Sequence, residues 1–406
     1  MDVLIVGGGG REHALAWKLA QSSVLGELHA APGNPGIAGL GTCHGVRADD
    51  TEALVALSRR LGVDLVVVGP EAPLVAGLAD ELRAAGVAVF GPSAAAAGIE
   101  GSKSFAKDVL GAAGVPTAVE LDEPRAPCVV KADGLAAGKG VFVCETEAEL
   151  AAALPRARAL GDRVVVEELL EGREVSLFAL CDGERALTLA PAQDFKRLLD
   201  GDLGPNTGGM GSYSPVPWVD DDEAEALTEA VHVPVLRELA ARGAPFQGLL
   251  YAGLMLTESG ARVLEFNCRF GDPETQAILP RLEGDLLEAL AAVAAGSLAG
   301  IDLTAGPETA VTLVLAAAGY PDATETGVPI DGIEEAEAAG ALVFHAGTAL
   351  SAGALVTSGG RVLNVTALAD SVGEAREHAY SAAERIELAG VQYRRDIARG
   401  AVHANA

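Results

Sequence analysis

The chain has 406 residues, which at about 150 residues per domain corresponds to roughly three domains. Half of its residues are hydrophobic and 21% are charged, a globular composition that excludes an intrinsically disordered protein. With 29 Lys and Arg against 57 Asp and Glu, the net charge of −28 argues against general binding to nucleic acids and anionic membranes.

The first hundred residues alternate short apolar segments with amphipathic ones. Strands are expected at residues 3–6, 27–30, 64–68 and 87–90, and helices at residues 12–21, 51–61 and 79–85. Glycine and proline stand where the strands stop, as in Gly69-Pro70 and Gly91-Pro92. We therefore expect an α/β domain with an open parallel sheet, whose ligands lie outside the carboxyl ends of the strands.

A run of four glycines, Gly7–Gly10, separates the first strand from the first helix. Free amides and the helix dipole favour an anion at such a position. A dinucleotide motif would need a third glycine where Glu12 or His13 stands, so the loop fits a single phosphate better than a pyrophosphate. The alternative is a tight turn that binds nothing.

Two lysine-bearing segments follow. Lys103 stands at an expected helix start, and Lys131 ends an apolar strand, residues 128–131. A glycine-rich turn that contains Lys139 leads into a second strand at residues 140–144, so we expect a hairpin. A lysine in an apolar strand is costly unless it meets an anion, and the turn offers amides to phosphates. The alternative is a hairpin with a solvent-exposed tip.

Carboxylates follow the next expected strand, at residues 164–170. These carboxylates and the free backbone groups beside them could contact an adenine and a ribose, but from the pattern alone we prefer solvated glutamates at a strand end. The polar, glycine-rich stretch 193–213 shows no periodicity, so we expect a long irregular loop. In it Asp194 could recognise an ammonium and Lys196 or Arg197 a phosphate, the alternative being a surface loop.

Residues 263–275 carry the most informative pattern. Alternation along a strand places Glu265, Asn267 and Arg269 on one face. Leu264, Phe266 and Cys268 are then expected in the core. Two oxygen ligands beside a guanidinium suit a hard cation that bridges phosphates, such as Mg²⁺. The alternative is an amphipathic edge strand; we prefer the metal because asparagine is disfavoured inside strands.

The rest of the sequence predicts further strands, a helix and a reducing compartment. We expect a hairpin at residues 249–257 and 262–267, then strands at 310–315, 341–346 and 361–366 and a helix at 371–386. The five cysteines form no CxxC pair, which argues against a disulfide framework and a zinc site. Without a basic leader or an apolar stretch of about 20 residues, we expect a cytoplasmic protein.

Six segments follow one another along the chain: GGGGREHALAW from residue 7, VGPEAPL from 68, GSKSFAKD from 101, VKADGLAAGKGV from 130, GPNTGGMGSYSP from 204 and EFNCRFGDPETQ from 265. Together they resemble the phosphoribosylamine–glycine ligase family of the ATP-grasp superfamily, over nearly the whole chain. The resemblance implies an N-terminal substrate domain (1–101) with an open parallel sheet. It also implies an ATP-grasp large subdomain with antiparallel sheets (102–114 and 182–309), a small lid subdomain (115–181) and a small C-terminal α+β domain (310–406).

The resemblance also implies an activity and its residues. ATP, with Mg²⁺ or Mn²⁺, would drive the joining of glycine to 5-phosphoribosylamine in purine synthesis, through glycyl phosphate. The residues it assigns to ATP are Lys103, Lys131, Lys139, Glu168, Leu170 and Glu174. Those it assigns to phosphoribosylamine or glycine are Gly8, Gly9, Gly10, Asn34, Glu71, Asp194 and Arg269. Lys131, Asp194, Arg269 and Asp272 would be catalytic, and Glu265 and Asn267 would bind the metal.

Three other functions stay open at this point. One is an ATP-grasp ligase that uses formate or bicarbonate, another is an NAD-dependent oxidoreductase, and the third is a nucleotide-binding module without catalysis. As partners we expect only the small-molecule substrates, with no nucleic acid and no membrane, and a monomer or a weak homo-oligomer.

Overall fold

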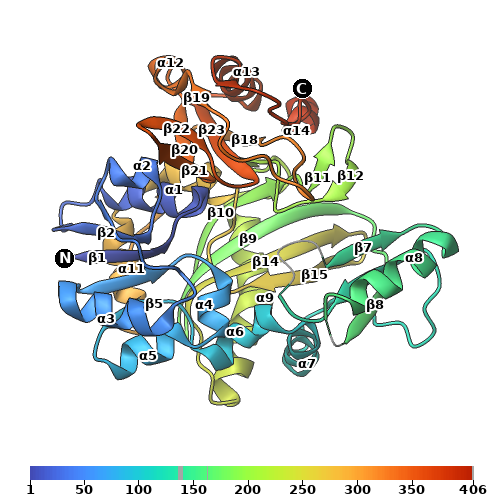
Figure 1. The fold of residues 1–406 in the computed structure, drawn as a ribbon. Coiled ribbons are helices and arrows are strands. Elements are labelled where there is room, and N and C mark those ends of the chain that lie inside the picture. The colour runs from blue at the N-terminus through green and yellow to red at the C-terminus, as the bar shows by residue number, and fades with distance from the viewer. Residues whose placement is uncertain (136–139, 162, 405–406) are drawn as a thin grey trace.

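The computed structural model describes residues 1–135, 140–161 and 163–404. Its N-terminal part is a five-stranded sheet in the order β3-β2-β1-β4-β5, drawn in blue in Figure 1. Its strands are β1 (Val3–Gly7), β2 (Leu28–Pro32), β3 (Thr42–Cys43), β4 (Leu65–Val68) and β5 (Ala88–Phe90). Every neighbouring pair is parallel, so the predicted open parallel sheet is confirmed.

Helices connect these strands and lead into the next part of the chain. They are α1 (Gly10–Leu19), α2 (Pro35–Ala38), α3 (Thr51–Leu61), α4 (Glu71–Val75), α5 (Leu78–Ala84), α6 (Ala94–Gly101) and α7 (Lys103–Ala113). Helix α1 begins two residues before the predicted Glu12. The backbone N–H of Gly9 donates to Glu12 Oε2 at 2.6 Å, so Glu12 lies inside the first turn and caps it.

The central and C-terminal parts share one eight-stranded antiparallel sheet in the order β15-β14-β9-β10-β13-β18-β23-β20. Its strands are β9 (Arg173–Asp182), β10 (Ala186–Asp194), β13 (Gly211–Ser214), β14 (Gln247–Thr257), β15 (Gly260–Asn267), β18 (Thr309–Ala316), β20 (Leu342–His345) and β23 (Arg361–Ala369). The hairpin predicted at residues 249–267 is confirmed as β14–β15. Because β13 pairs with β18, the C-terminal strands extend the central sheet.

Helices cover this sheet: α9 (Asp221–Ala241), α10 (Thr275–Arg281), α11 (Leu286–Ala294) and α13 (Val372–Ala383). Helix α11 contacts β4 and β5 of the N-terminal sheet and also β9 and β14 of the large one. It therefore lies between the two sheets, which share a hydrophobic core of residues from both.

A small sheet lies on the opposite side of the large sheet from the N-terminal domain (Figure 1, green). Its order is β7-β6-β8, with β6 (Cys128–Ala132), β7 (Val141–Cys144), β8 (Val164–Glu168) and helix α8 (Glu147–Arg158). The hairpin predicted around Lys131 is confirmed, since β6 and β7 pair antiparallel. These elements have their own hydrophobic core, separate from the two larger ones.

The prediction of an irregular loop over residues 193–213 is wrong. This stretch contains the hairpin β11 (Arg197–Leu199) and β12 (Leu203–Asn206), followed by β13 of the large sheet. Leu199 and Leu203 are both more than half exposed. Because neither face of this two-stranded hairpin is buried, its sequence carries no alternation of apolar and polar residues.

Short elements complete the described chain: β16 (Leu282–Glu283), β17 (Thr304–Ala305), β19 (Ile330–Asp331), β21 (Thr348–Ser351), β22 (Ala354–Thr357), β24 (Glu387–Leu388), α12 (Ile333–Ala338) and α14 (Arg399–Ala404). In residues 1–135, 140–161 and 163–404, no helix has the length and apolar character needed to cross a bilayer. All five cysteines are free.

One buried histidine makes the stability of the fold depend on pH. His232 lies on α9, fully buried, and its Nε2 contacts the carbonyl of Leu250 at 3.1 Å. Burial lowers the pKa of His232 from 6.5 to about 4. The folded state therefore keeps this imidazole neutral, whereas the unfolded chain protonates it below pH 6.5. The contribution of the neutral His232 to stability is complete above that pH, and about 3 kcal/mol of it is lost as the pH drops to 4.

His232→Gln should therefore flatten the decline of the free energy of unfolding between pH 6.5 and pH 4, measured by urea denaturation at a series of pH values. His378→Gln, on the exposed face of α13, is the matched control and should leave the slope unchanged. The slopes are compared, because the loss of a buried ring also lowers stability at every pH. Equal slopes in the His232 variant and the unaltered chain would contradict the assignment.

Candidate active site

One cleft of about 1350 Å³ is lined by residues of the small and the large sheet, by helices of the N-terminal part such as α4 and α6, and by the C-terminal segment. Among the residues singled out in the sequence, those that line it are Glu71, Lys103, Lys131, Glu168, Leu170, Glu174, Asp194, Glu265, Asn267, Arg269 and Asp272. These residues are separated by up to two hundred positions in the chain. The structure thus brings the two lysines, the proposed metal ligands and the guanidinium to one space.

Lys131 lies on β6 and is almost completely buried. Its Nζ contacts Glu167 Oε2 at 2.6 Å and donates to the carbonyl of Leu264 at 2.9 Å. Glu167 Oε1 in turn contacts Lys107 Nζ at 2.7 Å, so one buried carboxylate joins two lysines. The anion that offsets the burial of Lys131 is therefore within the protein. Sequence reasoning missed this partner, because it depends on the pairing of β6 with β8.

A β-bulge at Leu264 shapes the edge of the cleft. Gly253 pairs with Glu265 but Leu254 pairs with Val263, which leaves Leu264 as the extra residue of β15. The expectation that Leu264 enters the core is therefore wrong, since it lines the cleft and its carbonyl is free to accept from Lys131. Phe266 and Cys268 are buried as expected.

Lys196 joins two of the carboxylates in the cleft. Its Nζ lies 2.5 Å from Glu174 Oε1 and 3.4 Å from Glu265 Oε1. Lys196, followed by Lys131 and Lys103, lowers the pKa of Glu265 to about 2 although burial opposes the shift. Glu265 is consequently ionised at neutral pH, as a metal ligand must be. Burial lowers the pKa of Lys103, and the nearby Lys131 acts in the same direction.

Asp194 is a second, different kind of carboxyl group in the cleft. Its Oδ1 is buried and has no hydrogen-bond partner among the described residues. Burial, with the nearby Glu274, raises the pKa of Asp194 well above its usual value. A ligand cation beside this oxygen would supply the missing partner and favour the ionised form.

Arg269 lies between two carboxylates. Its Nε is 3.3 Å from Glu71 Oε2 and its Nη2 is 3.1 Å from Glu100 Oε1. Burial raises the pKa of Glu100, partly offset by Arg269. At Glu71 burial also acts to raise the pKa, but Arg269 and Arg11 together with hydrogen bonds outweigh it, and the pKa falls. Glu100 also accepts from the backbone N–H of Cys268 at 2.7 Å. It lies at the end of an Ala-rich helix, and no motif in the sequence singled it out.

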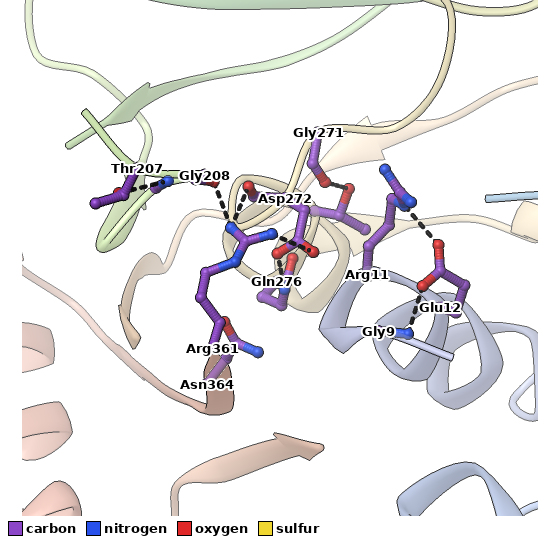
Figure 2. A network of polar contacts seen from close by, with 12 residues as sticks. Gly9, Arg11, Glu12, Thr207, Gly208, Gly271, Asp272, Gln276, Arg361 and Asn364 are labelled. Atoms are coloured by element: carbon purple, nitrogen blue, oxygen red, sulfur yellow. Dashed lines mark hydrogen bonds and ion pairs between the residues drawn. The ribbon is translucent and has the colours of Figure 1, made fainter. Parts of the chain in front are cut away.

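Asp272 is held by residues of the large sheet and of α10 (Figure 2). Arg361 Nη2 lies 2.9 Å from Asp272 Oδ2, and Arg361 also donates to the carbonyls of Asp272 and Gly208. Gln276 Nε2 donates to Asp272 Oδ1 at 2.8 Å. Arg361 comes from β23, so the C-terminal part of the chain positions this carboxylate. Sequence reasoning missed Arg361, since a lone arginine at a strand start carries no local signal.

The first glycine loop lies beside the cleft and not in its lining. A Cβ on Gly9 would come within 3.7 Å of Asp272 Oδ2, which places the loop next to that carboxylate. A Cβ on Gly8 would lie 2.3 Å from the carbonyl oxygen of Gly33, and one on Gly10 would overlap Asn364. Glycine is therefore required here for close packing.

Asn34 is engaged within the protein. It caps α2, where Oδ1 accepts from the N–H of Ile37, and its Nδ2 donates to the carbonyls of Gly8 and His345. These bonds hold the glycine loop against the C-terminal strands. A direct contact of Asn34 with substrate stays a prediction, as does that of Gly8, Gly9 and Gly10. Lys139 lies outside the described residues.

The donor groups of the cleft bear on metal binding. In the part of the chain that the structure describes, no three or more His, Cys, Asp and Glu side chains are grouped so that they could hold a metal ion. Glu265 and Asn267 lie on the same side of β15 and both line the cleft. Two such oxygens suit an ion that takes the rest of its shell from water and phosphate, as Mg²⁺ does.

Family models match most of the chain in three consecutive parts. That described as "Phosphoribosylglycinamide synthetase, N domain" matches residues 1–100, the corresponding "ATP-grasp (A) domain" residues 101–275 and the "C domain" residues 310–400. The phosphoribosylamine–glycine ligase of Streptomyces coelicolor is 53% identical over 420 residues, covering 100% of both chains. That of Mesorhizobium japonicum is 50% identical over 419 residues, covering 99% of each.

Solved structures agree with these matches. A crystal structure of phosphoribosylamine–glycine ligase from Thermotoga maritima has a TM-score of 0.84 at 34% identity, covering 98% of this chain and 100% of that chain. The biotin carboxylase domain of the Hydrogenobacter thermophilus 2-oxoglutarate carboxylase, in complex with MgADP, has a TM-score of 0.70 at 16% identity. That alignment covers 100% of this chain and 98% of the domain, and it shows a likeness of fold alone.

Proposed function

The chain belongs to the phosphoribosylglycinamide synthetase family, and from this premise we propose that it joins glycine to phosphoribosylamine through glycyl phosphate in the cleft described above. The ATP-dependent ligation itself, a step of purine biosynthesis that uses ATP with Mg²⁺, follows from the family and its relatives. Membership of this family decides against the formate- or bicarbonate-using ligase, the oxidoreductase and the non-catalytic module.

The proposed reaction has two steps. A carboxylate oxygen of glycine attacks the γ-phosphorus of ATP, and the bond to the β-phosphate oxygen breaks to release ADP. The amine nitrogen of phosphoribosylamine then attacks the acyl carbon, the amide bond forms, phosphate leaves with that glycine oxygen, and the nitrogen loses a proton. The carboxylate is already a nucleophile, so the protein must mainly position the reactants and neutralise charge.

The observation that carries this proposal is that cations and oxygen ligands from separate parts of the chain face one cleft. We assign Lys103 and Lys131 to the ATP phosphates, together with Lys139 of the segment outside the described residues. Glu167 holds Lys131 in place through the contact of 2.6 Å between its Oε2 and Lys131 Nζ. The adenine and ribose are assigned to Glu168 at the end of β8, Leu170 just after it and Glu174 at the start of β9.

Glu265 and Asn267 would hold the Mg²⁺ that accompanies ATP, and the bound ion supplies positive charge to the phosphate oxygens. Lys196 contacts Oε1 of Glu265, so Oε2 remains available for a cation. This lysine also offsets the negative charges of Glu174 and Glu265 at once, and it lowers the pKa of Glu265.

The amino acid and phosphoribosylamine are assigned to other residues in and beside the cleft. Arg269 suits the glycine carboxylate and Asp194 its ammonium, with Asp272 beside the reacting groups. The glycine loop of residues 8–10, Asn34 and Glu71 are assigned to phosphoribosylamine, since they come from the carboxyl ends of the N-terminal strands.

The domain limits implied by these roles remain part of the proposal. Residues 1–101 would bind phosphoribosylamine, residues 102–114 and 182–309 would form the large ATP-grasp subdomain, residues 115–181 its lid, and residues 310–406 a C-terminal domain. We also propose that the chain works in the cytoplasm as a monomer or weak homo-oligomer, without nucleic acid. The net charge of −28 supports the last point, and light scattering after size-exclusion chromatography tests the oligomeric state.

Isotope transfer tests the intermediate directly. With ATP, Mg²⁺, freshly made phosphoribosylamine and glycine labelled with ¹⁸O in its carboxylate, we expect glycinamide ribonucleotide in the mass spectrum and one ¹⁸O atom in each phosphate released. The label moves because the oxygen that attacks the γ-phosphorus departs with phosphate. Phosphate without label would refute glycyl phosphate, and the absence of product would refute the ligation. Formate and bicarbonate in place of glycine are the controls.

A further inference from the structure

Arg394, near the end of the chain, is the largest fully buried side chain of the described residues. Its guanidinium makes two parallel contacts with Asp396, from Nε and from Nη2, both at 2.7 Å. Its Nη1 reaches Asp202 Oδ1 at 2.7 Å. A bidentate guanidinium of this kind has a defined orientation, which a lysine could not reproduce.

The same guanidinium contacts the residues on both sides of Lys196, which lies between β10 and β11. Nη1 donates to the carbonyl of Arg197 at 3.2 Å, and the guanidinium carbon lies 5.0 Å from the centre of the Phe195 ring. Arg394 therefore touches the residues immediately before and after Lys196. None of the roles assigned so far involves the segment around Arg394.

Backbone bonds extend this contact to the turn of the β11–β12 hairpin. The N–H of Gly201 donates to Asp396 Oδ2 at 2.8 Å, and the N–H of Arg395 donates to Asp200 Oδ1 at 2.7 Å. A two-stranded hairpin with both faces exposed has little stability of its own. Residues 394–396 thus hold the hairpin at one edge of the cleft, where Arg394 and Asp396 belong to the lining.

Lys196 needs such support for its contacts with Glu174 and Glu265. Its side chain has four rotatable bonds, so its ammonium stays on two carboxylates only if the backbone beneath it is fixed. Thr207 secures the carbonyl of Lys196 by two hydrogen bonds, from its N–H at 2.7 Å and from its hydroxyl at 2.9 Å. Arg394 secures the neighbouring residues on both sides.

We propose that Arg394 is a positioning residue for the ligation, which holds Lys196 on Glu174 and Glu265 and so links the C-terminal segment to the nucleotide end of the cleft. The proposal rests on the function proposed above. It differs from a merely structural role, because it requires that the effect of Arg394 pass through Lys196.

A double-mutant cycle separates these two roles. Arg394→Met, Lys196→Met and the double variant are compared with the unaltered chain in kcat and KM for MgATP, and in the Kd for the non-hydrolysable analogue AMP-PNP with Mg²⁺. We expect Arg394→Met to lower kcat/KM about 10- to 100-fold and to weaken analogue binding, as the loss of an outer supporting contact typically does. The double variant should be no worse than Lys196→Met alone.

The matched control is Arg395→Met, whose side chain is exposed and stacks on Tyr393, with 5.1 Å between the guanidinium carbon and the ring centre. It should leave kcat, KM and Kd unchanged, and Arg394→Lys should recover only part of the loss. The proposal would be overturned if the fold losses of the two single variants multiplied in the double variant. It would also be overturned if Arg394→Met left kcat, KM and Kd unchanged. Analogue binding yields the same cycle even if no ligation product forms, so a failure of the proposed function is distinguishable.

A milder variant covers the case in which Arg394→Met does not fold. Asp202 is an exposed partner of Arg394, and Asp202→Ala removes one contact without burying a new group. We expect a smaller loss of MgATP affinity that again disappears in the background of Lys196→Met. A loss that persists unchanged in that background would contradict the coupling.

Discussion

Replacing Lys131 by methionine should lower kcat/KM for ATP by about 10²- to 10³-fold while the chain stays folded. A preorganised cation in a cleft that excludes water contributes this much to the transfer of a charged group. Methionine has a similar volume and leaves Glu167 paired with Lys107, whose Nζ is 2.7 Å away, so no buried carboxylate is stranded. ADP release at saturating glycine and phosphoribosylamine measures the effect, and circular dichroism checks the fold.

Lys107→Met provides the comparison, because Lys107 contacts the same carboxylate but also donates to the carbonyl of Ala118 at 2.6 Å. It supports Lys131 and is not itself assigned to phosphate, so we expect a loss smaller than tenfold. An equal loss in the two variants would place the function in the shared carboxylate instead of in Lys131. Unchanged turnover in Lys131→Met would remove Lys131 from the catalytic residues.

Glu265→Gln should raise the Mg²⁺ concentration needed for half-maximal activity. Loss of a residue that only supports a metal ligand typically weakens metal binding roughly 10- to 100-fold, and loss of the ligand itself should have a larger effect. The substitution keeps the size of the side chain and removes the charge that Mg²⁺ prefers in its ligands. It also leaves Lys196 with Glu174 as its remaining carboxylate, at 2.5 Å. Titration of activity with Mg²⁺ at fixed ATP measures the change.

The pH dependence of stability gives a second readout for the same variant. Because Lys196, Lys131 and Lys103 hold the pKa of Glu265 at about 2, below its ordinary 4.5, this carboxylate contributes stability above pH 4.5 that is lost as the pH falls toward 2. Glu265→Gln removes that contribution, so its stability should vary less over this range. Glu258→Gln, in the exposed turn of the same hairpin, is the control for both measurements. Equal Mg²⁺ requirements in the two variants would refute the metal assignment.

Much of the fold followed from local patterns. The strands β1 and β4 are buried on both faces, so they read as continuous apolar runs bounded by glycine and proline. Helix α3 occupies the predicted residues 51–61, with Asp50 as its N-cap and Gly62 at its end in a left-handed conformation. The hairpin β11–β12 was missed because its exposed faces leave no apolar periodicity.

The sequence by itself singled out many residues that line the cleft, since these stand at a strand end, in a glycine-rich turn or on one face of a strand. What only the tertiary structure decided is which of them touch. These contacts join residues that are far apart in the chain: Glu167 with Lys131, Glu100 with Arg269, Arg361 with Asp272, and Arg394 with the residues on both sides of Lys196. Strand register, the bulge at Leu264 and the packing of separate sheets determine such contacts, and none of these leaves a periodic trace in the local sequence.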